Sequence, residues 1–274
     1  MKILAVQNRM GIGDTVIFLP FIKALYKKFG SPISLLVKES SKAEQYLDQM
    51  DYIGKIIILE RDSKNFNRHS GIFGSLNLIK DLNKYNFDKI FIFNSSLRYN
   101  LISKFSNIPE IYQYPLFEKR HQHIFETPKK MFKEKLNLDI KDDPEINLDK
   151  NLIDKSIKEF RINKNETNIL LGIGGSGPTK RIPSKIFLEV IGLIKKIRKC
   201  RFFLATGKNK EEQIILREIL NSNYKDFCEP LDDLTIKQIL PVIKNCDISI
   251  CNDSSFSHIS AALGLQTIVL MADT

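Results

Sequence analysis

The chain has 274 residues, enough for two domains, and its 43% hydrophobic and 27% charged residues are typical of globular proteins. No apolar stretch reaches the roughly 18 residues of a membrane span, and the N-terminal sequence MKILAVQNRMGIGD lacks the apolar core and cleavage site of a signal peptide, which favours a cytoplasmic protein. The net charge of +10 favours anionic partners, but the lysines are scattered and do not interleave with aromatic residues, so we expect no nucleic-acid partner.

The first half of the chain alternates short apolar runs with stretches of helical periodicity. Strands are predicted at residues 3–6, 33–37, 56–59 and 90–93. A single helix is predicted over residues 15–29, with one apolar face made of Val16, Leu19, Ile22 and Leu25. Residues 104–150 are less regular, and their polar end, DIKDDPEINLDK at 139–150, is expected to be an interdomain linker.

The alternation restarts in the second half of the chain. Strands are predicted at 168–172, 201–205, 247–251 and 266–271, and helices at 184–197, 211–220, 235–243 and 257–263. This rhythm indicates two open parallel sheets covered by helices, in α/β domains that comprise residues 1–145 and 146–274. Because ligands of such sheets bind beyond the carboxyl ends of the strands, the loops that directly follow strands are the candidate sites.

The loop after the first strand, residues 8–14, contains G-x-G. Val16 occupies the third glycine position of the dinucleotide fingerprint, and Asp14 would repel a pyrophosphate, so an oxidoreductase that uses a nicotinamide or flavin cofactor is disfavoured. A carboxylate at a strand end suits a general base that takes a proton from a substrate hydroxyl. A cap on a helix that begins at Thr15 is an equally good interpretation of Asp14.

The loop that follows the strand at 168–172 is rich in glycine and ends in adjacent cations. Its glycines permit close backbone approach, and Ser176 and Thr179 offer hydroxyl donors to a diphosphate whose charge Lys180 and Arg181 would neutralise. The spacing is not that of a P-loop. A surface loop without a ligand is the alternative.

The third loop belongs to the stretch DISICNDSSFSHISAALG, residues 247–264, where a buried strand turns directly into a helix. A helix N-terminus presents free N–H groups and a positive dipole end, so it can bind an anion. Asp253, Ser254 and Ser255 could instead cap that helix, with His258 bonded to a neighbour. On this stretch alone the two interpretations remain open.

Taken together and in order, three motifs resemble the bacterial heptosyltransferases, glycosyltransferase family 9, over essentially the whole chain. They are G-I-G-D at 11–14, G-G-S-G-P-T-K-R-I-P at 174–183 and N-D-S-S-F-S-H-I-S-A-A-L-G at 252–264. The resemblance implies a GT-B fold, in which an acceptor-side Rossmann-like domain and a nucleotide-sugar-binding domain face a central cleft. Ile182 replaces the family's tryptophan and Ser255 its glycine, and the chain ends at 271–274 around the usual F-G-P-T. We therefore expect a short C-terminal part, in a truncated chain or a shortened relative.

The resemblance implies an inverting, metal-independent glycosyltransferase that uses no cofactor. It would move a heptose-like sugar from a nucleotide-diphosphate donor, ADP-heptose, to a lipopolysaccharide core or related glycan. Asp14 matches the family's general base, in an acceptor-side loop with Arg9, Gly11 and Gly13. The donor-binding positions that it implies are Ser176, Thr179, Lys180, Arg181, Asp253, Ser254, Ser255 and His258.

The partners that follow from the resemblance are the nucleotide-sugar donor and an anionic glycolipid or glycan acceptor. A lipid-linked acceptor would bring the protein into peripheral contact with the inner membrane face. The alternative is a relative with a shortened C-terminus that binds a nucleotide-sugar or glycan without catalysis. Donor binding without product formation would identify that alternative.

Overall fold

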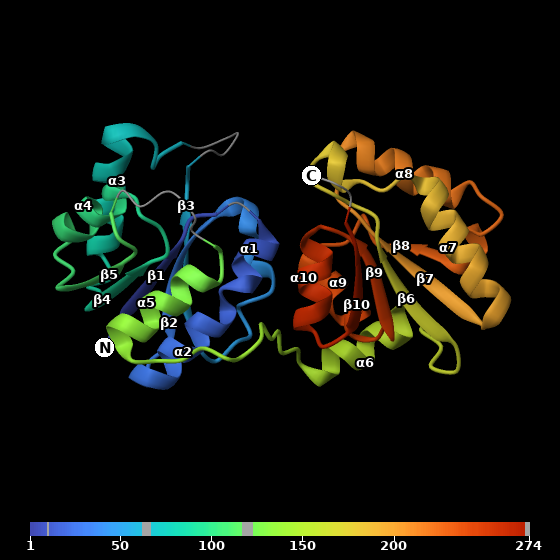
Figure 1. Ribbon diagram of the computed structural model, residues 1–274, viewed down its shortest axis with the longest axis horizontal. Coiled ribbons are helices and arrows are strands. Elements are labelled where there is room, and N and C mark those ends of the chain that lie inside the picture. The colour runs from blue at the N-terminus through green and yellow to red at the C-terminus, as the bar shows by residue number, and fades with distance from the viewer. Residues whose placement is uncertain (10, 62–66, 117–122, 272–274) are drawn as a thin grey trace. The chain divides into compact units, whose positions relative to one another are not determined.

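The computed structural model describes residues 1–9, 11–61, 67–116 and 123–271. The chain divides into two compact units, Met1–Pro144 and Glu145–Thr274. Each unit is built on one five-stranded sheet (Figure 1), and all the pairings between described strands are parallel, which confirms the predicted α/β class. Within the described part of the chain, no helix is both long and apolar enough to cross a membrane.

The first unit has the strand order β3-β2-β1-β4-β5. Its strands are β1 (Ile3–Gln7), β2 (Ile33–Lys38), β3 (Ile53–Leu59), β4 (Lys89–Ile92) and β5 (Glu110–Gln113). Its helices are α1 (Ile12–Ile17), α2 (Leu19–Phe29), α3 (Gly71–Asn83), α4 (Leu97–Phe105) and α5 (Glu126–Leu136). Two short 3-10 turns, η1 (Glu39–Ser41) and η2 (Ala43–Gln45), follow β2.

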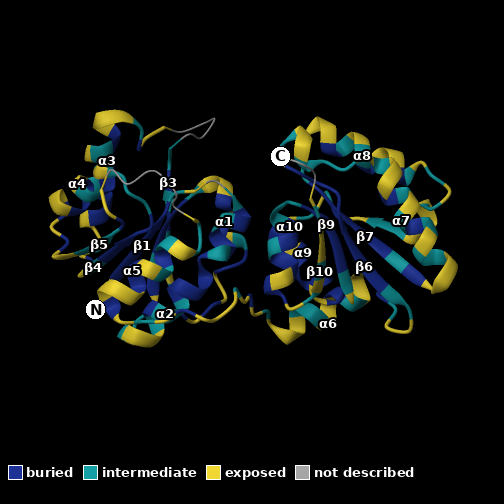
Figure 2. Ribbon diagram, in the orientation of Figure 1, coloured by how far each residue is buried: buried dark blue, intermediate teal, exposed yellow. Residues whose placement is uncertain are grey.

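Helices cover both faces of this sheet, and the central strand β1 is buried along its whole length (Figure 2). On one face, Leu4 and Val6 belong to a core cluster with Leu78 of α3 and Tyr99 of α4. On the other face, aromatic side chains of α2 and α5 pack against each other. The ring centroids of Phe21 in α2 and Phe132 in α5 lie 5.2 Å apart. This aromatic contact holds α2 and α5 together over the sheet.

The predicted helix over residues 15–29 is wrong in its bounds, because the structure has two helices there. α1 begins earlier, at Ile12, and ends before Phe18, from which α2 continues. Pro20 lies at the second position of α2. Its ring has no N–H to donate and would clash with the carbonyl group four residues earlier, which kinks or breaks a helix. Here α1 ends before Phe18, and Pro20 lies in the first turn of α2, where no N–H is needed. Because α1 begins at Ile12, Asp14 lies inside this short helix.

The expectation of irregular structure over residues 104–150 is also wrong in part, since this stretch holds β5 and α5. Neither has a strong apolar pattern. The β5 sequence Glu-Ile-Tyr-Gln belongs to a short edge strand, and the sequence of α5 is dominated by lysine. The described residues 137–149 form neither helix nor strand, as expected of a linker, but α6 begins at Lys150.

The second unit has the strand order β10-β9-β6-β7-β8. Its strands are β6 (Thr167–Gly172), β7 (Cys200–Ala205), β8 (Cys228–Pro230), β9 (Ile248–Asn252) and β10 (Gln266–Leu270). Its helices are α6 (Lys150–Glu159), α7 (Ser184–Ile197), α8 (Lys210–Leu220), α9 (Ile236–Lys244) and α10 (Ser255–Ala262). The 3-10 turns are η3 (Pro178–Lys180) and η4 (Lys225–Phe227).

The predicted elements of this unit are confirmed to within two residues at each end, and α7 has the predicted bounds. Among the described strands and α-helices of this unit, only the edge strand β8 and the helix α6 were not predicted. The core on one face of the sheet joins Ile169 and Leu171 of β6 to Phe187 of α7 and Leu216 of α8. The helices α6 and α9 pack against each other, and α10 packs against β9 and β10.

The two sheets share one topology, which locates two switch points. In each unit the first strand of the sheet is central, with the second strand on one side and the fourth on the other. The strand order therefore reverses between β1 and β4 in the first unit and between β6 and β9 in the second. Open α/β sheets bind ligands beyond the carboxyl ends of the strands at such points. All three motif loops follow β1, β6 or β9.

Candidate functional site

In the first unit, the loop after β1 holds the Asp14 carboxylate in a fixed place. Gly11 is the N-cap residue of α1, and Asp14 is the third residue of that helix. The Oδ2 atom of the half-buried Asp14 accepts a hydrogen bond from the Gly11 backbone N–H at 3.0 Å. The capping interpretation expected Asp14 to precede a helix that begins at Thr15. Asp14 instead lies inside α1, and its carboxylate bonds back to the N–H of the N-cap residue Gly11. Arg9 is exposed, and Met10 lies outside the described residues.

Gln7 is a residue of this loop that sequence reasoning missed. Its side chain is 2% exposed at the end of β1. Its Nε2 atom donates to the Asp14 carbonyl oxygen at 3.2 Å, and its Oε1 atom accepts from the Arg9 backbone N–H at 2.8 Å. One buried amide therefore fixes both sides of the loop. The available signal was a glutamine at the last position of an otherwise apolar strand.

A network of amide side chains lies across the switch point of the first unit. Asn94, which follows β4, donates from Nδ2 to Oδ1 of Asn8, which follows β1, at 3.1 Å. Gln113 in β5 donates to the Asn94 carbonyl oxygen at 3.0 Å and accepts from Asn100 at 2.9 Å. Three neighbouring strand ends are thereby tied together by groups that also suit hydrogen bonding to sugar hydroxyls.

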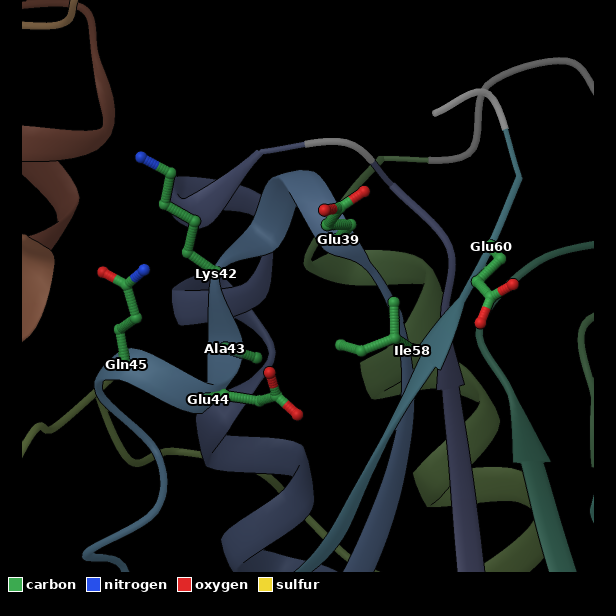
Figure 3. A pocket seen from close by; sticks show the side chains of 7 residues that line it. All are labelled: Glu39, Lys42, Ala43, Glu44, Gln45, Ile58 and Glu60. Atoms are coloured by element: carbon green, nitrogen blue, oxygen red, sulfur yellow. The ribbon is translucent and has the colours of Figure 1, made fainter. Parts of the chain in front are cut away.

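A separate pocket of about 490 Å³ lies beside the turns η1 and η2 and the end of β3 (Figure 3). Its charged lining consists of Glu39, Glu44 and Glu60 against the single cation Lys42. In Figure 3 the Lys42 side chain extends away from Glu60 and Ile58. Carboxylates repel phosphate oxygens, so this pocket is unsuited to the phosphates of a donor or an acceptor.

In the second unit, the glycine-rich loop needs its glycines for close approach. A Cβ atom on Gly172 would lie 2.6 Å from the Cys251 Sγ atom, and one on Gly175 would lie 2.5 Å from the Lys180 carbonyl oxygen. The first contact lets β6 and β9 meet closely at the switch point. The second lets the loop fold back on itself before α7 begins. Pro183 is the N-cap residue of α7 rather than its first helical residue.

Glu212 supports this loop and was also missed by sequence reasoning. It is 6% exposed, and its Oε1 atom accepts a hydrogen bond from the Gly175 backbone N–H at 2.6 Å. The sequence Asn-x-x-Glu at 209–212 predicts a capping box at the start of α8. The Asn209 side chain does cap α8, but the Glu212 carboxylate bonds to the glycine-rich loop instead. A buried carboxylate thus links the loops that follow β6 and β7.

The structure brings the two predicted motifs of this unit together through one ion pair. The Nζ atom of Lys180 lies 2.5 Å from Oδ2 of Asp253. Arg181 donates from Nη1 to the Gly175 carbonyl oxygen at 3.2 Å and so remains within the same loop. Ser176 and Thr179, by contrast, are exposed. One cation of the second motif, Lys180, therefore lies beside the acid of the third.

The turn from β9 into α10 ends at an N-cap residue, Ser254, whose side chain does not cap the helix. Ser254 has an extended backbone conformation. Its Oγ atom is buried and has no hydrogen-bond partner in the described chain. Asn252 fixes the turn by donating from Nδ2 to the Ile173 carbonyl oxygen at 3.0 Å. Ser255 begins α10, and His258 lies in its first turn, half-buried.

This arrangement combines the features of an anion site. The positive end of α10, a hydroxyl without a partner and the cations Lys180 and Arg181 belong to loops at a single switch point. Helix N-termini and convergent cations both favour phosphate groups. The switch point of the first unit differs, since it offers one carboxylate and several amides.

The chain is similar to known proteins in both sequence and structure. The sequence model of the family described as "Glycosyltransferase family 9 (heptosyltransferase)" matches residues 110–274 of this chain. In sequence, the chain is 27% identical over 129 residues to lipopolysaccharide heptosyltransferase 1 of Campylobacter coli, a match that covers 44% of this chain. The match spans only 38% of that relative's own length.

Solved structures share the fold over nearly the whole chain. A glycosyltransferase family 9 protein from Veillonella parvula superposes with a TM-score of 0.80 at 17% identity, over 100% of this chain and 82% of that one. The ADP-heptose lipopolysaccharide heptosyltransferase II of E. coli superposes with a TM-score of 0.76 at 18% identity, over 99% of this chain and 85% of that one. The GT-B type of α/β fold that the motifs predicted is thereby confirmed.

Proposed function

The chain belongs to glycosyltransferase family 9, as its three motifs predicted, and from this membership we propose that it transfers a heptose-like sugar from a nucleotide-diphosphate donor. The donor is ADP-heptose, after the E. coli neighbour that is named for it. The acceptor is a lipopolysaccharide core or related glycan, after the C. coli relative. The acceptor would be a lipid-linked anion at the inner membrane face.

The observation that carries this proposal is the set of cations, helix N-terminus and unpartnered hydroxyl at the switch point of the second unit. A departing diphosphate gains negative charge as its bond to the sugar breaks. Lys180, Arg181 and the N-terminus of α10 would stabilise that charge, with Ser254 as an additional hydroxyl donor. Donors fixed before the reaction stabilise a transition state without reorganisation, and the loss of one typically costs about 3 kcal/mol.

The proposed mechanism is a single displacement with inversion. Asp14 accepts the proton of an acceptor hydroxyl as the hydroxyl oxygen forms a bond to the anomeric carbon. The bond from that carbon to the diphosphate oxygen breaks on the opposite face, and the nucleoside diphosphate leaves with the electron pair. The cations balance its charge, so the mechanism requires no metal ion. His258 and Ser255 would contact the donor near the diphosphate.

Donor binding is the first test. Thermal-shift and calorimetric titrations with ADP-, GDP-, UDP- and dTDP-sugars should reveal stabilisation by the ADP-sugar. Lys180→Ala should weaken this binding by about tenfold or more, because it removes a direct charge partner of the diphosphate. Lys185→Ala, a change at an exposed lysine in the neighbouring helix α7, is the matched control and should leave binding unchanged. Equal losses in the two variants would contradict the assignment.

The role of Asp14 requires a separate test, because one observation favours the alternative of binding without catalysis. The Asp14 carboxylate already accepts the Gly11 N–H, which is what a merely structural cap would do. A general base predicts that Asp14→Asn abolishes transfer, measured as product by mass spectrometry, while donor affinity is retained. If the unaltered protein binds the donor but gives no product with any glycan acceptor, the binding alternative is correct.

A further inference from the structure

Two adjacent helices of the first unit expose an apolar surface. α3 and α4 cover one face of the sheet with Leu78, Leu82, Tyr99 and Ile102, so those inner positions account for their packing. Their outer positions carry six large hydrophobic side chains. They are Ile72 (83% exposed), Phe73 (82%), Leu76 (51%), Leu97 (41%), Leu101 (42%) and Phe105 (66%). We call these six residues the α3–α4 apolar face.

The six side chains form one stripe along each helix and do not lie singly on the surface. Leu76 follows Ile72 and Phe73 by four and three positions, which places them on one side of α3. Leu97, Leu101 and Phe105 recur every four positions along α4. The two helices are joined by Arg98 of α4, which donates to the Ser75 hydroxyl at 3.0 Å and to the His69 carbonyl oxygen. The exposed ends of both helices are seen in Figure 2.

The exposed charges that α3 and α4 themselves carry are cationic. Lys80 lies one turn beyond Leu76 on the same side of α3, and Lys104 precedes Phe105 on α4. Both helices are described in full, and their one acid, Asp81, is buried among Arg68, His69 and Lys84. Monomeric proteins rarely expose clustered apolar side chains without a partner. Helices with apolar groups and a cationic rim are typical of proteins that lie on anionic membranes.

We infer that the α3–α4 apolar face docks on the surface of an anionic lipid bilayer. Phe73 and Phe105 would enter the boundary between headgroups and acyl chains, and Lys80 and Lys104 would contact lipid phosphates. The inference deepens the proposed function. The docking surface follows from the exposed side chains alone, and only its purpose rests on the proposed lipid-linked acceptor. Docking would hold the acceptor-side unit at the layer that presents the acceptor.

Vesicle binding of the full chain tests this inference without donor, acceptor or turnover, so its failure is distinct from failure of the proposed function. Co-sedimentation with phosphatidylglycerol vesicles should exceed that with phosphatidylcholine vesicles. The double variant Phe73→Ser/Phe105→Ser should lower the partition coefficient by about tenfold or more, since two large apolar groups no longer leave water. The matched control is Leu193→Ser/Ile197→Ser on α7, where the side chains are 63% and 77% exposed. It should bind as the unaltered protein does.

A second pair of variants tests the cations. Lys80→Glu/Lys104→Glu should abolish the preference for anionic vesicles, whereas Lys155→Glu/Lys158→Glu, on exposed positions of α6, should largely keep it. Unchanged thermal unfolding and unchanged ADP-sugar binding would show that the variants are folded. The inference is overturned if the protein ignores vesicles or if the α7 control loses binding equally. It is also overturned if Phe73→Ser/Phe105→Ser dissociates a dimer in light scattering without affecting vesicle binding, because a second copy would then be the occupant.

Discussion

At the scale of single residues, Asp81 is the charge on which the packing of α3 depends. Its carboxylate is buried and contacts Arg68 at 2.9 Å, Lys84 at 2.7 Å and Nε2 of His69 at 3.1 Å. The Glu60 N–H donates to Nδ1 of His69, so Nε2 carries the proton donated to Asp81. Burial raises the pKa of Asp81, but hydrogen bonds from Lys84, His69 and Arg68 outweigh it and lower that pKa to about 2.

This lowered pKa predicts a loss of stability in acid. Because the folded pKa of about 2 lies below the ordinary value of 3.8, the ionised group stabilises the fold above about pH 4. The stabilisation disappears as pH falls from about 4 to about 2, and amounts to about 2 kcal/mol. Asp81→Asn should therefore unfold more easily in urea at pH 6, with a shallower loss of stability between pH 4 and 2.

The control for this prediction is Asp143→Asn, which alters an exposed carboxylate of the same unit. Its stability at pH 6 and its acid dependence should follow those of the unaltered chain. If Asp81→Asn and Asp143→Asn give the same urea midpoints at every pH, the buried cluster does not stabilise the fold as stated.

At the scale of elements, Gly74 decides how closely α3 approaches the segment before it. A Cβ atom at this position would lie 2.2 Å from the His69 carbonyl carbon. Glycine to alanine in a helix normally stabilises by up to about 1 kcal/mol. Here we expect Gly74→Ala to destabilise by about 1–3 kcal/mol, because the backbone must shift to remove the overlap. Differential scanning calorimetry would report the sign directly.

A tolerated glycine provides the comparison. Gly177 has an extended backbone, and a Cβ atom there would meet nothing within 4 Å. Gly177→Ala should leave the melting temperature almost unchanged. A Gly74→Ala protein as stable as Gly177→Ala would mean that α3 adjusts its position at little cost.

The loop between β1 and α1 gives a second prediction at this scale. Gln7→Leu keeps the bulk of the side chain but leaves the Asp14 carbonyl and the Arg9 N–H without their buried partner, at a cost of about 1–3 kcal/mol. Transfer activity should fall further than donor affinity, since Asp14 loses its position. Gln7→Glu keeps the acceptor for Arg9 but sets a buried carboxylate against the Asp14 carbonyl oxygen, so it should be no milder than Gln7→Leu. Wild-type activity in Gln7→Leu would rule out a positioning role.

Particular elements show how far the sequence predicts the fold. α7 was predicted with its correct bounds because its apolar residues follow a helical period without interruption. The prediction of one helix over residues 15–29 failed because the apolar face continues across Phe18, where α1 ends and α2 begins just before Pro20. β5 was missed because none of its four residues is fully buried. α5 was missed because lysines surround the residues that it does bury, which are Pro128, Met131, Phe132 and Leu136. Periodicity therefore predicts elements of mostly apolar sequence well, and edge strands and lysine-rich helices poorly.

At the scale of the whole molecule, the proposed chemistry predicts independence from divalent metals. The diphosphate charge would be balanced by Lys180, Arg181 and the N-terminus of α10. Dialysis against EDTA should therefore leave the transfer rate unchanged, and added Mg²⁺ should not raise it. A rate that collapses in EDTA and returns with Mg²⁺ would contradict this mechanism.

The candidate site was predictable where residues themselves carry the chemistry. Asp14, Lys180 and Asp253 were identified from motifs, and the structure adds that the last two form an ion pair. Gln7 and Glu212 were not predicted as site residues, because their side chains bond to backbone groups of the loops and belong to no motif. For Glu212 that role depends on which strand ends are neighbours in the sheet, and this information is not local in the sequence. Gln7 holds groups of its own loop, and its only signal was its place at the end of an apolar strand.

The ion pair between Lys180 and Asp253 has a consequence for turnover. A nucleotide that takes Lys180 as its partner must displace a carboxylate, so binding exchanges one charge pair for another and gains less free energy than a new pair would. Asp253→Asn should therefore bind ADP several-fold more tightly and release it more slowly in stopped-flow measurements. Asp253 would compete with the nucleotide for Lys180. By forming the ion pair again after each transfer, it would speed release of the nucleoside diphosphate product.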